Sequence, residues 1–257
     1  MRYAKPVLLG RGALSAYLVL VLSLVLLFCK GISQSATRAE VQPTIQIPSN
    51  VAWTEETIRL ASGGDAFRGL LWSRRCSHCH GSEGFSEEGG IPDLAGLDRL
   101  SLWKQLQDFR AGKRRSAAMQ PIASGLSDQN IADLAAYFSM LPTSPDPQDN
   151  RAFPQPILDR LHTSIAVRLV VFGDAARGIP PCQACHGPVG FIKGAPSLMT
   201  QNGTYLRNQM QQFSDGSRAN DINVVMRSIV NQLTDVEKTS LAEFYGAGPQ
   251  SAGGLHP

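Results

Sequence analysis

The pentapeptide CSHCH, at residues 76–80, decides how the rest of this sequence is interpreted. It places two of the chain's five cysteines three residues apart and follows the second at once with a histidine. The same arrangement returns as CQACH at residues 182–186. Residues three and four apart share one face of a helix, so each motif would direct two thiols and one imidazole at a single flat ligand.

Paired thiols beside an imidazole are the groups that attach a c-type haem. The two thiols add to the two vinyl groups of haem, and the histidine that follows them reaches the iron. We therefore predict two covalently bound haem c groups, one for each motif. The predicted attachment residues are Cys76, Cys79, Cys182 and Cys185, and the predicted iron ligands from the motifs are His80 and His186.

Zinc, thiol-redox and disulfide roles fit these cysteines less well. Zinc sites built from two C-x-x-C pairs space the pairs by about 15–20 residues, far less than the separation of Cys79 and Cys182. A thioredoxin-like pair expects a βαβ context and explains neither the histidines nor the repetition. Disulfides between the motifs would join equivalent positions of two domains, which is an unusual arrangement. Cys29 lies in an apolar segment and is interpreted as a small hydrophobic residue.

The chain repeats itself beyond the two motifs. SLWKQLQDFRAGKR at 101–114 matches YLRNQMQQFSDGSR at 205–218, and LSDQNIADLAAYF at 126–138 matches LTDVEKTSLAEFY at 233–245. The segment GDAFRG before the first motif likewise matches GDAARG before the second. The matches keep their order along the chain, which indicates a duplicated domain.

Both copies have the pattern of helices. Apolar residues recur at helical spacing, and no stretch shows sustained alternation. Ser127 and Thr234 stand where helix N-caps belong, and Thr234 with Glu237 has the spacing of a capping box. Gly112 and Gly216 fit helix C-termini. The predicted fold class is all-α, with two tandem domains preceded by an N-terminal apolar helix.

The length of 257 residues suits two small domains and an N-terminal segment. A proline-rich stretch separates the two copies and predicts a stiff, extended connector. The predicted organisation is an export signal or membrane anchor at 1–32, a spacer at 33–52, a first domain at 53–142, a linker at 143–156, a second domain at 157–247 and a disordered tail at 248–257.

The N-terminus predicts export. Arg2, Lys5 and Arg11 precede the apolar run from Ala13 to Cys29, and positive residues keep that end in the cytoplasm. The run is longer than the roughly 7–15 residues of a signal-peptide core, and no clean cleavage site follows it. An anchor is therefore favoured over a cleaved signal. Either outcome places the haem domains in the periplasm, soluble or held at the inner membrane.

The basic residues of the N-terminal segment account for the net charge of +3, and the remainder of the chain is close to neutral. A near-neutral body argues against nucleic-acid binding, which needs clustered cationic surface. The local exception is RAGKRR at 110–115. We interpret it as a solvated loop, with docking of an acidic partner beside the first haem as the alternative.

A second axial ligand decides whether a haem iron carries electrons or binds a substrate. Methionine suits a high-potential carrier, because its soft thioether favours ferrous iron. Met119 and Met226 are the predicted ligands, since each lies seven residues before the leucine that precedes the last helix of its copy. The methionines interpreted as core packing are Met140, Met199 and Met210, and the histidines without a predicted role are His78, His162 and His256.

With both methionines and GIPPCQACHG at 178–187, the duplicated motif resembles the two-haem cytochromes c of the c4 type. The likeness runs from about Ile58 to Gly246. It implies two class I cytochrome c domains related by pseudo-twofold symmetry, with the haems close across the domain interface. It also implies that the backbone carbonyls of Pro92 and Pro196 accept hydrogen bonds from the iron-ligating imidazoles.

We therefore expect a dihaem electron carrier, not an enzyme, that passes single electrons between respiratory redox proteins. Two irons with histidine and methionine ligands leave no position for a substrate. The expected partners are a membrane quinol-oxidising complex, a terminal oxidase or a periplasmic dehydrogenase, and the chain is expected to be monomeric. The alternative is a dihaem enzyme, such as a peroxidase or thiosulfate dehydrogenase, or the electron-transfer subunit of a dehydrogenase.

Overall fold

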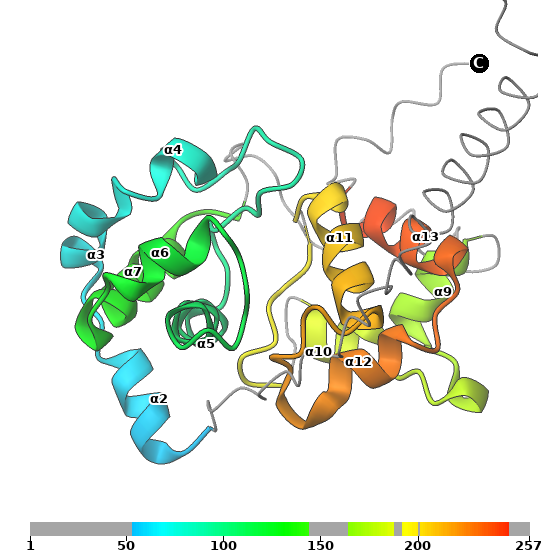
Figure 1. Cartoon of the computed structure of the whole chain (residues 1–257). Coiled ribbons are helices and arrows are strands. Elements are labelled where there is room, and N and C mark those ends of the chain that lie inside the picture. The colour runs from blue at the N-terminus through cyan, green and yellow to red at the C-terminus, as the bar shows by residue number, and fades with distance from the viewer. Residues whose placement is uncertain (1–52, 144–163, 188–191, 200, 247–257) are drawn as a thin grey trace, which may run out of the picture. The chain divides into compact units, whose positions relative to one another are not determined.

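The computed structural model of the chain describes residues 53–143, 164–187, 192–199 and 201–246 (Figure 1). Apart from one isolated bridge between Asp174 and Ile179, every element in these ranges is a helix, so the all-α prediction is confirmed. The N-terminal apolar segment, the linker after residue 143 and the tail fall outside these ranges. Among the helices described, none is long and apolar enough to cross a membrane.

The helices of the two halves form two groups, coloured cyan to green and yellow-green to red in Figure 1. The first half contains α2 (Glu55–Ser62), α3 (Ala66–Ser73), α4 (Ser77–His80), α5 (Arg99–Arg110), α6 (Met119–Ser124) and α7 (Asp128–Met140). The second contains α9 (Ile165–Val171), η1 (Ala175–Arg177), α10 (Cys182–His186), α11 (Gly203–Ser214), η2 (Ile222–Val224), α12 (Val225–Val230) and α13 (Asp235–Gly246). The main packing lies within each half, where α3 and α5 contact α7, and α9 and α11 contact α13.

Side-chain caps fix where the last helix of each half begins. The Ser127 hydroxyl accepts a hydrogen bond from the third amide of α7 at 3.1 Å. Thr234 accepts from the Glu237 amide at 3.2 Å, and the Glu237 carboxylate accepts in return from the Thr234 amide at 2.8 Å, which completes the predicted capping box. Gly112 and Gly216, just past α5 and α11, have φ of 70° and 76°, a left-handed conformation that glycine adopts without steric cost.

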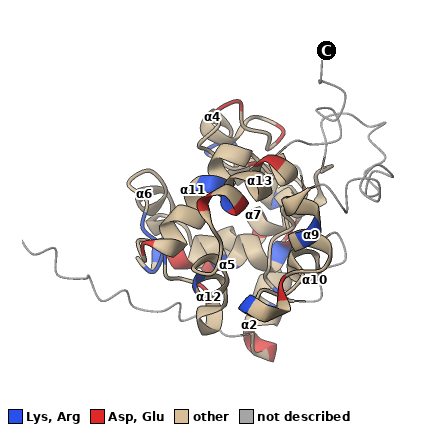
Figure 2. Cartoon of the chain, turned by 90° about the vertical axis from the view of Figure 1, so that its right-hand side faces the viewer, with Lys and Arg blue, Asp and Glu red and all other residues tan. Residues whose placement is uncertain are grey.

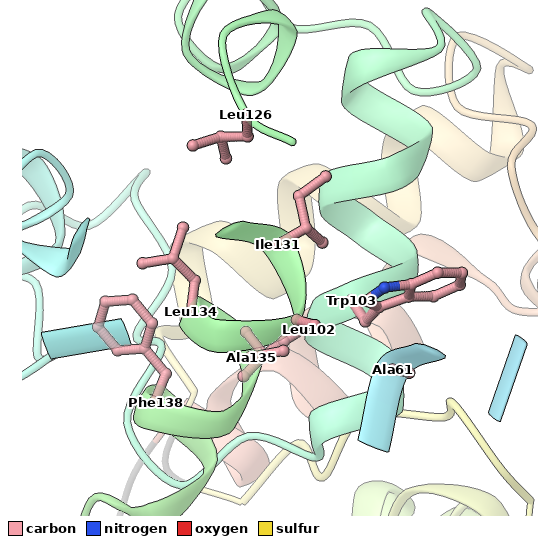
Figure 3. Packing of buried hydrophobic residues seen from close by; sticks show 9 residues of the cluster. Ala61, Leu102, Trp103, Leu126, Ile131, Leu134, Ala135 and Phe138 are labelled. Carbon is pink, nitrogen blue, oxygen red and sulfur yellow. The ribbon is translucent and has the colours of Figure 1, made fainter. Parts of the chain in front are cut away.

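Each half buries its own apolar core. In the first half the apolar face of α7 packs against α5 and α2 (Figure 3). Its buried members are Ala61, Leu102, Trp103, Leu126, Ile131, Ala132, Leu134, Ala135 and Phe138. The buried members of the second core are Ala166, Leu169, Val170, Ile179, Leu206, Leu233, Leu241, Ala242 and Tyr245. Two cores built from one repeated pattern are what a duplicated helical domain produces.

Hydrogen bonds between polar side chains join the two halves. The side-chain amide of buried Asn220 donates to Asp108 at 2.7 Å and to Gln105 at 3.0 Å. The buried Lys104 ammonium donates to the Asn220 carbonyl at 2.6 Å and also to the Asp108 carboxylate. Because these groups are buried, each would lose its hydration without compensation if its partner were removed. We call the side chains of Lys104, Gln105, Asp108 and Asn220, together with the two arginines described next, the interdomain cluster.

Two equivalent arginines complete the interdomain cluster. Arg114 donates to Gln105 of its own half and to Gln209 of the other, both at 2.8 Å. Arg218 donates to Gln209 at 2.8 Å and to Gln105 at 3.2 Å. Each arginine therefore binds the same pair of equivalent glutamines, as pseudo-twofold symmetry requires. Arg114 also donates to the Tyr205 hydroxyl at 2.8 Å.

The basic segment at 110–115 is only in part the solvated loop that its composition predicts, because Arg115 is exposed but Arg110 and Arg114 make tertiary contacts. Arg114 is 8% exposed and lies between the halves. Arg110 donates to the Leu126 carbonyl at 2.9 Å and to the Asp128 carboxylate at 2.5 Å. Tertiary contacts thus engage two charges that the sequence leaves free. Elsewhere both signs of charge are spread along the described helices (Figure 2).

Candidate haem-binding sites

The first motif forms the short helix α4 and the residue before it. The His80 amide donates to the Cys76 carbonyl at 2.9 Å, so the two residues lie on the same face of one turn. His80 is buried, Cys76 is half-buried and Cys79 is exposed. Nδ1 of His80 lies 2.7 Å from the Pro92 carbonyl oxygen. Because a carbonyl only accepts, Nδ1 carries the proton and Nε2 keeps the lone pair that a metal needs.

The second motif forms α10, and its histidine faces a methionine. Nδ1 of His186 lies 2.8 Å from the Pro196 carbonyl oxygen, and Nε2 lies 3.5 Å from the Met226 sulfur. With the proton on Nδ1, the two facing atoms both bear lone pairs, which are the groups that would bind a metal ion. The donor set, one imidazole nitrogen and one thioether sulfur, is the ligand pair of a high-potential haem. These residues therefore fit haem iron.

Burial favours the neutral form of one thiol and one imidazole in each motif. It raises the pKa of the Cys76 and Cys182 thiols to about 11. It also lowers the pKa of the His80 and His186 imidazoles, by more than the hydrogen bonds to the proline carbonyls raise it. A neutral imidazole is the form that ligates a metal, so both rings are ready for a ligand role at neutral pH.

Disulfide and zinc roles for the cysteines find no support in the structure. The described cysteines, Cys76, Cys79, Cys182 and Cys185, are free thiols, so no disulfide joins the two motifs. Nowhere in the described ranges do three or more His, Cys, Asp or Glu side chains gather as a metal-binding cluster.

Met226 lies in α12, after a backbone segment with an uncommon conformation. Asn223 and Val224 have φ of 55° and 61°, and a β-branched residue rarely adopts this left-handed region. The buried Asp221 carboxylate spans the segment, accepting from the Arg227 amide at 3.0 Å and from its Nε at 2.7 Å. These contacts hold the chain on both sides of Met226.

Met119 begins α6, and its amide donates to the Ser116 hydroxyl at 3.1 Å. In the part of the chain that the structure describes, a sulfur contact joins His186 to Met226, but none joins His80 to Met119. In both halves the candidate ligands lie on separate elements, α4 and α6 in the first and α10 and α12 in the second. The sulfur contact between them is in the second half.

The remaining methionines and histidines divide into three groups. Met199 and Met210 pack against the second core, as predicted. Met140 is 70% exposed, so its interpretation as a core residue is wrong. It is the last residue of α7, past the stretch of that helix that packs on its neighbours. His78 is exposed. The histidines that lie outside the described residues are His162 and His256.

Neither the interdomain cluster nor the contact made by Asp221 is predicted by the sequence patterns above. Arg114 and Arg218 occupy the same position in the two duplicated segments, and that alignment is the signal that could have paired them. No comparable signal marks Asp221. Its contact with Arg227 depends on a left-handed turn at Asn223 and Val224. An asparagine followed by a valine does not predict such a turn.

Sequence comparison with known proteins finds relatives of the same organisation. Residues 69–138 match the family described as cytochrome c oxidase, cbb3-type, subunit III. A cytochrome c4 from Pseudomonas aeruginosa is 33% identical over 187 residues, which cover 71% of this chain and 88% of the relative. A Stutzerimonas stutzeri protein named thiosulfate dehydrogenase electron acceptor is 37% identical over 173 residues, which cover 66% of this chain and 77% of the relative.

Solved structures with the same arrangement of helices include two kinds of protein. The crystal structure of reduced recombinant cytochrome c4 from Pseudomonas stutzeri matches with a TM-score of 0.60 and 31% identity, covering 71% of this chain and 98% of that one. A thiosulfate dehydrogenase from Marichromatium purpuratum matches with a TM-score of 0.57 and 29% identity, covering 74% of this chain and 42% of that one.

Proposed function

The chain belongs to the cytochrome c4 family, and from this premise we propose that each half holds its haem iron between one histidine and one methionine. The proposed iron ligands are His80 and Met119 in the first half and His186 and Met226 in the second. The proposed attachment residues are Cys76 and Cys79, and Cys182 and Cys185. The carbonyls of Pro92 and Pro196 would orient the two histidines.

The chain carries two covalently bound haem c groups and is an electron carrier, not an enzyme. Its partners are redox proteins. When bound, haem iron supplies a one-electron couple whose potential depends on its ligands and surroundings. The protein's own side chains attach the group, orient it and exclude water from it.

One observation supports the ligand assignment above the others. Nε2 of His186 faces the Met226 sulfur at 3.5 Å, while Nδ1 donates to the Pro196 carbonyl at 2.8 Å. The carbonyl fixes the tautomer and the ring orientation and makes the ligating nitrogen more basic. The thioether favours the reduced metal. With one histidine and one methionine of this chain as the ligands of each iron, no position would remain for a substrate, and the chemistry left would be electron transfer.

We also propose that the interdomain cluster supports haem binding through its charge. Lys104 pairs with Asp108, but in the described residues the hydrogen bonds of Arg114 and Arg218 go only to neutral oxygens. Burial and repulsion by Arg114 lower the pKa of Arg218, which shows that its charge is costly here. Haem carries propionate carboxylates, and these would neutralise the surplus positive charge of the cluster.

For the site of action we propose the periplasm, because the order of charges and apolar residues in segment 1–32 favours export. For the electron donor we propose a thiosulfate dehydrogenase, since two relatives are named as electron acceptors of that enzyme. The other partners expected from the sequence, a quinol-oxidising complex, a terminal oxidase or another dehydrogenase, serve as comparisons in assays of electron transfer. We further propose that the N-terminal segment anchors the chain in the membrane.

Haem quantification and spectroscopy of the purified holoprotein test the ligand assignment. We expect two haem c groups per chain and a low-spin ferric spectrum that includes the methionine-to-iron charge-transfer band. Met226→Ala should remove about half of that band. Met140→Ala, a change at an exposed methionine, should leave it intact. A high-spin signal in the unmodified protein, or a full band in Met226→Ala, would contradict the assignment.

A kinetic assay tests the donor. Purified thiosulfate dehydrogenase and thiosulfate should reduce both haems of this chain in saturable fashion, whereas a quinol-oxidising complex with a quinol should do so more slowly. The opposite ranking would replace the proposed donor and leave the haem ligands unaffected.

A further inference from the structure

The outward face of α3 carries an apolar surface that the fold does not need. Phe67, Leu70 and Leu71 are 84%, 46% and 68% exposed. They stand three and four residues apart and so line one face of the helix. The opposite face is already used, because Gly69 and Ser73 are buried and α3 packs on α7.

The second half has no equivalent of this surface. At the position of Phe67 it has Ala176, and IPP replaces the LLWSRR that follows Gly69. The helix is reduced there to η1, a turn of three residues. A half of this fold therefore forms without the exposed apolar face. A cluster of large apolar side chains turned to solvent is typical of a surface that contacts a partner.

Two arginines extend the same surface toward the haem motif. Arg74 and Arg75 are exposed, and neither guanidinium pairs with a carboxylate in the ranges that the structure describes. Arg75 lies over the Trp72 ring at 4.8 Å, which keeps its charge near the apolar face. Arg68 differs, because its guanidinium is engaged by Asp133 at 2.8 Å.

The geometry points to a protein partner whose surface complements both the apolar side chains and the arginines. We propose that the α3 patch, defined as Phe67, Leu70, Leu71, Arg74 and Arg75, docks an electron-donating redox protein whose contact face is apolar and rimmed by carboxylates. Apolar contact supplies affinity, and the unpaired guanidiniums complement the rim.

The position of the α3 patch suits electron entry. Arg75 directly precedes Cys76, and α4 with His80 follows at once. A protein bound to the patch therefore lies beside the site proposed for the first haem, so electrons would enter through the first half. This inference rests on the proposed attachment of that haem at Cys76 and Cys79 and on the electron-carrier function.

The apolar part is tested with Phe67→Ser/Leu71→Ser in the full-length holoprotein. The matched control is Ile165→Ser/Phe172→Ser, which removes two exposed apolar side chains from the second half. Stopped-flow mixing measures the second-order rate constant of reduction by thiosulfate dehydrogenase with thiosulfate, and by hexaammineruthenium(II) as a small reductant. Loss of two apolar contacts should slow the protein donor about tenfold, since each 1.4 kcal/mol of binding is tenfold.

The charged part is tested with Arg74→Gln/Arg75→Gln, against the control Lys193→Gln/Arg207→Gln at exposed residues of the second half. The patch variant should flatten the salt dependence of the protein reaction, because screening acts on the charges that were removed. The control should keep the wild-type salt dependence.

The outcomes separate the docking proposal from the function on which it rests. Slowing confined to the protein donor and to the α3 patch variants supports it. Equal rates for patch and control variants overturn it while the carrier function stands, and so does a patch variant altered only in self-association or in binding to anionic vesicles. Wild-type protein that neither reductant reduces would overturn both.

Discussion

The two halves differ in the segment between their shared glycine and their cysteine motif. In the first half, LLWSRR follows Gly69 and belongs largely to α3, a helix of eight residues. In the second, IPP follows Gly178, and only η1, with three residues, forms before it. Proline lacks an amide donor and stops a helix, so the second half cannot extend η1. A duplicated fold thus tolerates a helix or a turn between the same two anchors.

The glycines that anchor this segment serve different purposes. A Cβ on Gly69 would lie 2.1 Å from the Asp133 carbonyl oxygen, so the close packing of α3 on α7 requires glycine. Gly178 has φ of 69°, and a Cβ there would meet nothing within 4 Å. Its need is the left-handed backbone that glycine adopts freely. The same residue at the same place answers a packing constraint in one half and a conformational one in the other.

The arginine of the segment finds an acidic partner in both halves, but from different positions. Arg68 donates to Asp133 of α7 at 2.8 Å, whereas Arg177 donates to Glu237 of α13 at 2.6 Å. In the repeat alignment Asp133 falls opposite Ser240, not opposite Glu237. Both halves therefore have this ion pair, but the carboxylate lies about one turn earlier on the last helix of the second half than on that of the first.

The largest difference between the halves is expected when the haem of one half is removed. Cys76→Ala/Cys79→Ala and Cys182→Ala/Cys185→Ala should each leave one haem c per chain, because each motif attaches its own group. Haem quantification and intact mass measure this. His78→Ala, at an exposed position inside the first motif, should keep both haems. Loss of both haems from either double variant would show that the halves do not mature independently.

The next largest effect concerns the potentials of the two haems. Met119→Ala and Met226→Ala should each lower the potential of one haem by about 0.1–0.3 V, since a thioether favours ferrous iron. The other haem should shift much less. Potentiometric titration followed by visible spectra measures both. If Met119→Ala changes neither haem, the first half has a different ligand, and Met140 becomes the candidate to replace.

A smaller effect is expected in the stability of the second half. A hydrogen bond from Arg177 holds the pKa of Glu237 at about 2, below its ordinary 4.5. A depressed carboxylate pKa stabilises the folded state above pH 4.5, and that stabilisation is lost as the pH falls toward 2. Glu237→Gln should lower the free energy of unfolding by about 1–2 kcal/mol at neutral pH, and the difference should shrink toward pH 2.

Denaturant titrations at several pH values measure this difference. Asp133→Asn should act in the same direction in the first half: burial works to raise the pKa of Asp133, but hydrogen bonds led by that from Arg68 outweigh it and lower the pKa. Asp235→Asn removes a carboxylate whose side chain is 92% exposed and should change stability by no more than about 0.5 kcal/mol. A pH-independent loss in Glu237→Gln would mean that packing, not charge, is what the glutamate contributes.

The smallest effect sharpens the comparison of the two methionine segments. Asp221→Asn should loosen the chain around Met226 and shift the potential of the second haem by about 30–60 mV, where 59 mV corresponds to a tenfold change. Ser116→Ala removes the single side-chain contact to the Met119 amide and should shift the first haem less. Voltammetry resolves shifts of this size. A larger shift in Ser116→Ala would reverse the assignment of the more constrained segment.

Local chemistry makes much of this molecule predictable. The caps Ser127 and Thr234 satisfy amides only three residues away, so their roles follow from spacing alone. The candidate ligand Met226 stands out because the repeat places it opposite Met119. The core prediction for Met140 fails, because helical spacing does not show where the packed part of a helix ends.

The sequence by itself determined the haem motifs, the duplication and the all-α fold, because each depends on residues close together in the chain or on a pattern repeated along it. Only the tertiary structure decided which arginines are buried and which stay exposed. Arg114 stands in a basic run that looks solvated, yet it is buried against Gln209 of the other half. Arg74 and Arg75 stay exposed beside an apolar face. Burial and pairing depend on which distant groups arrive nearby, and no short-range pattern encodes that.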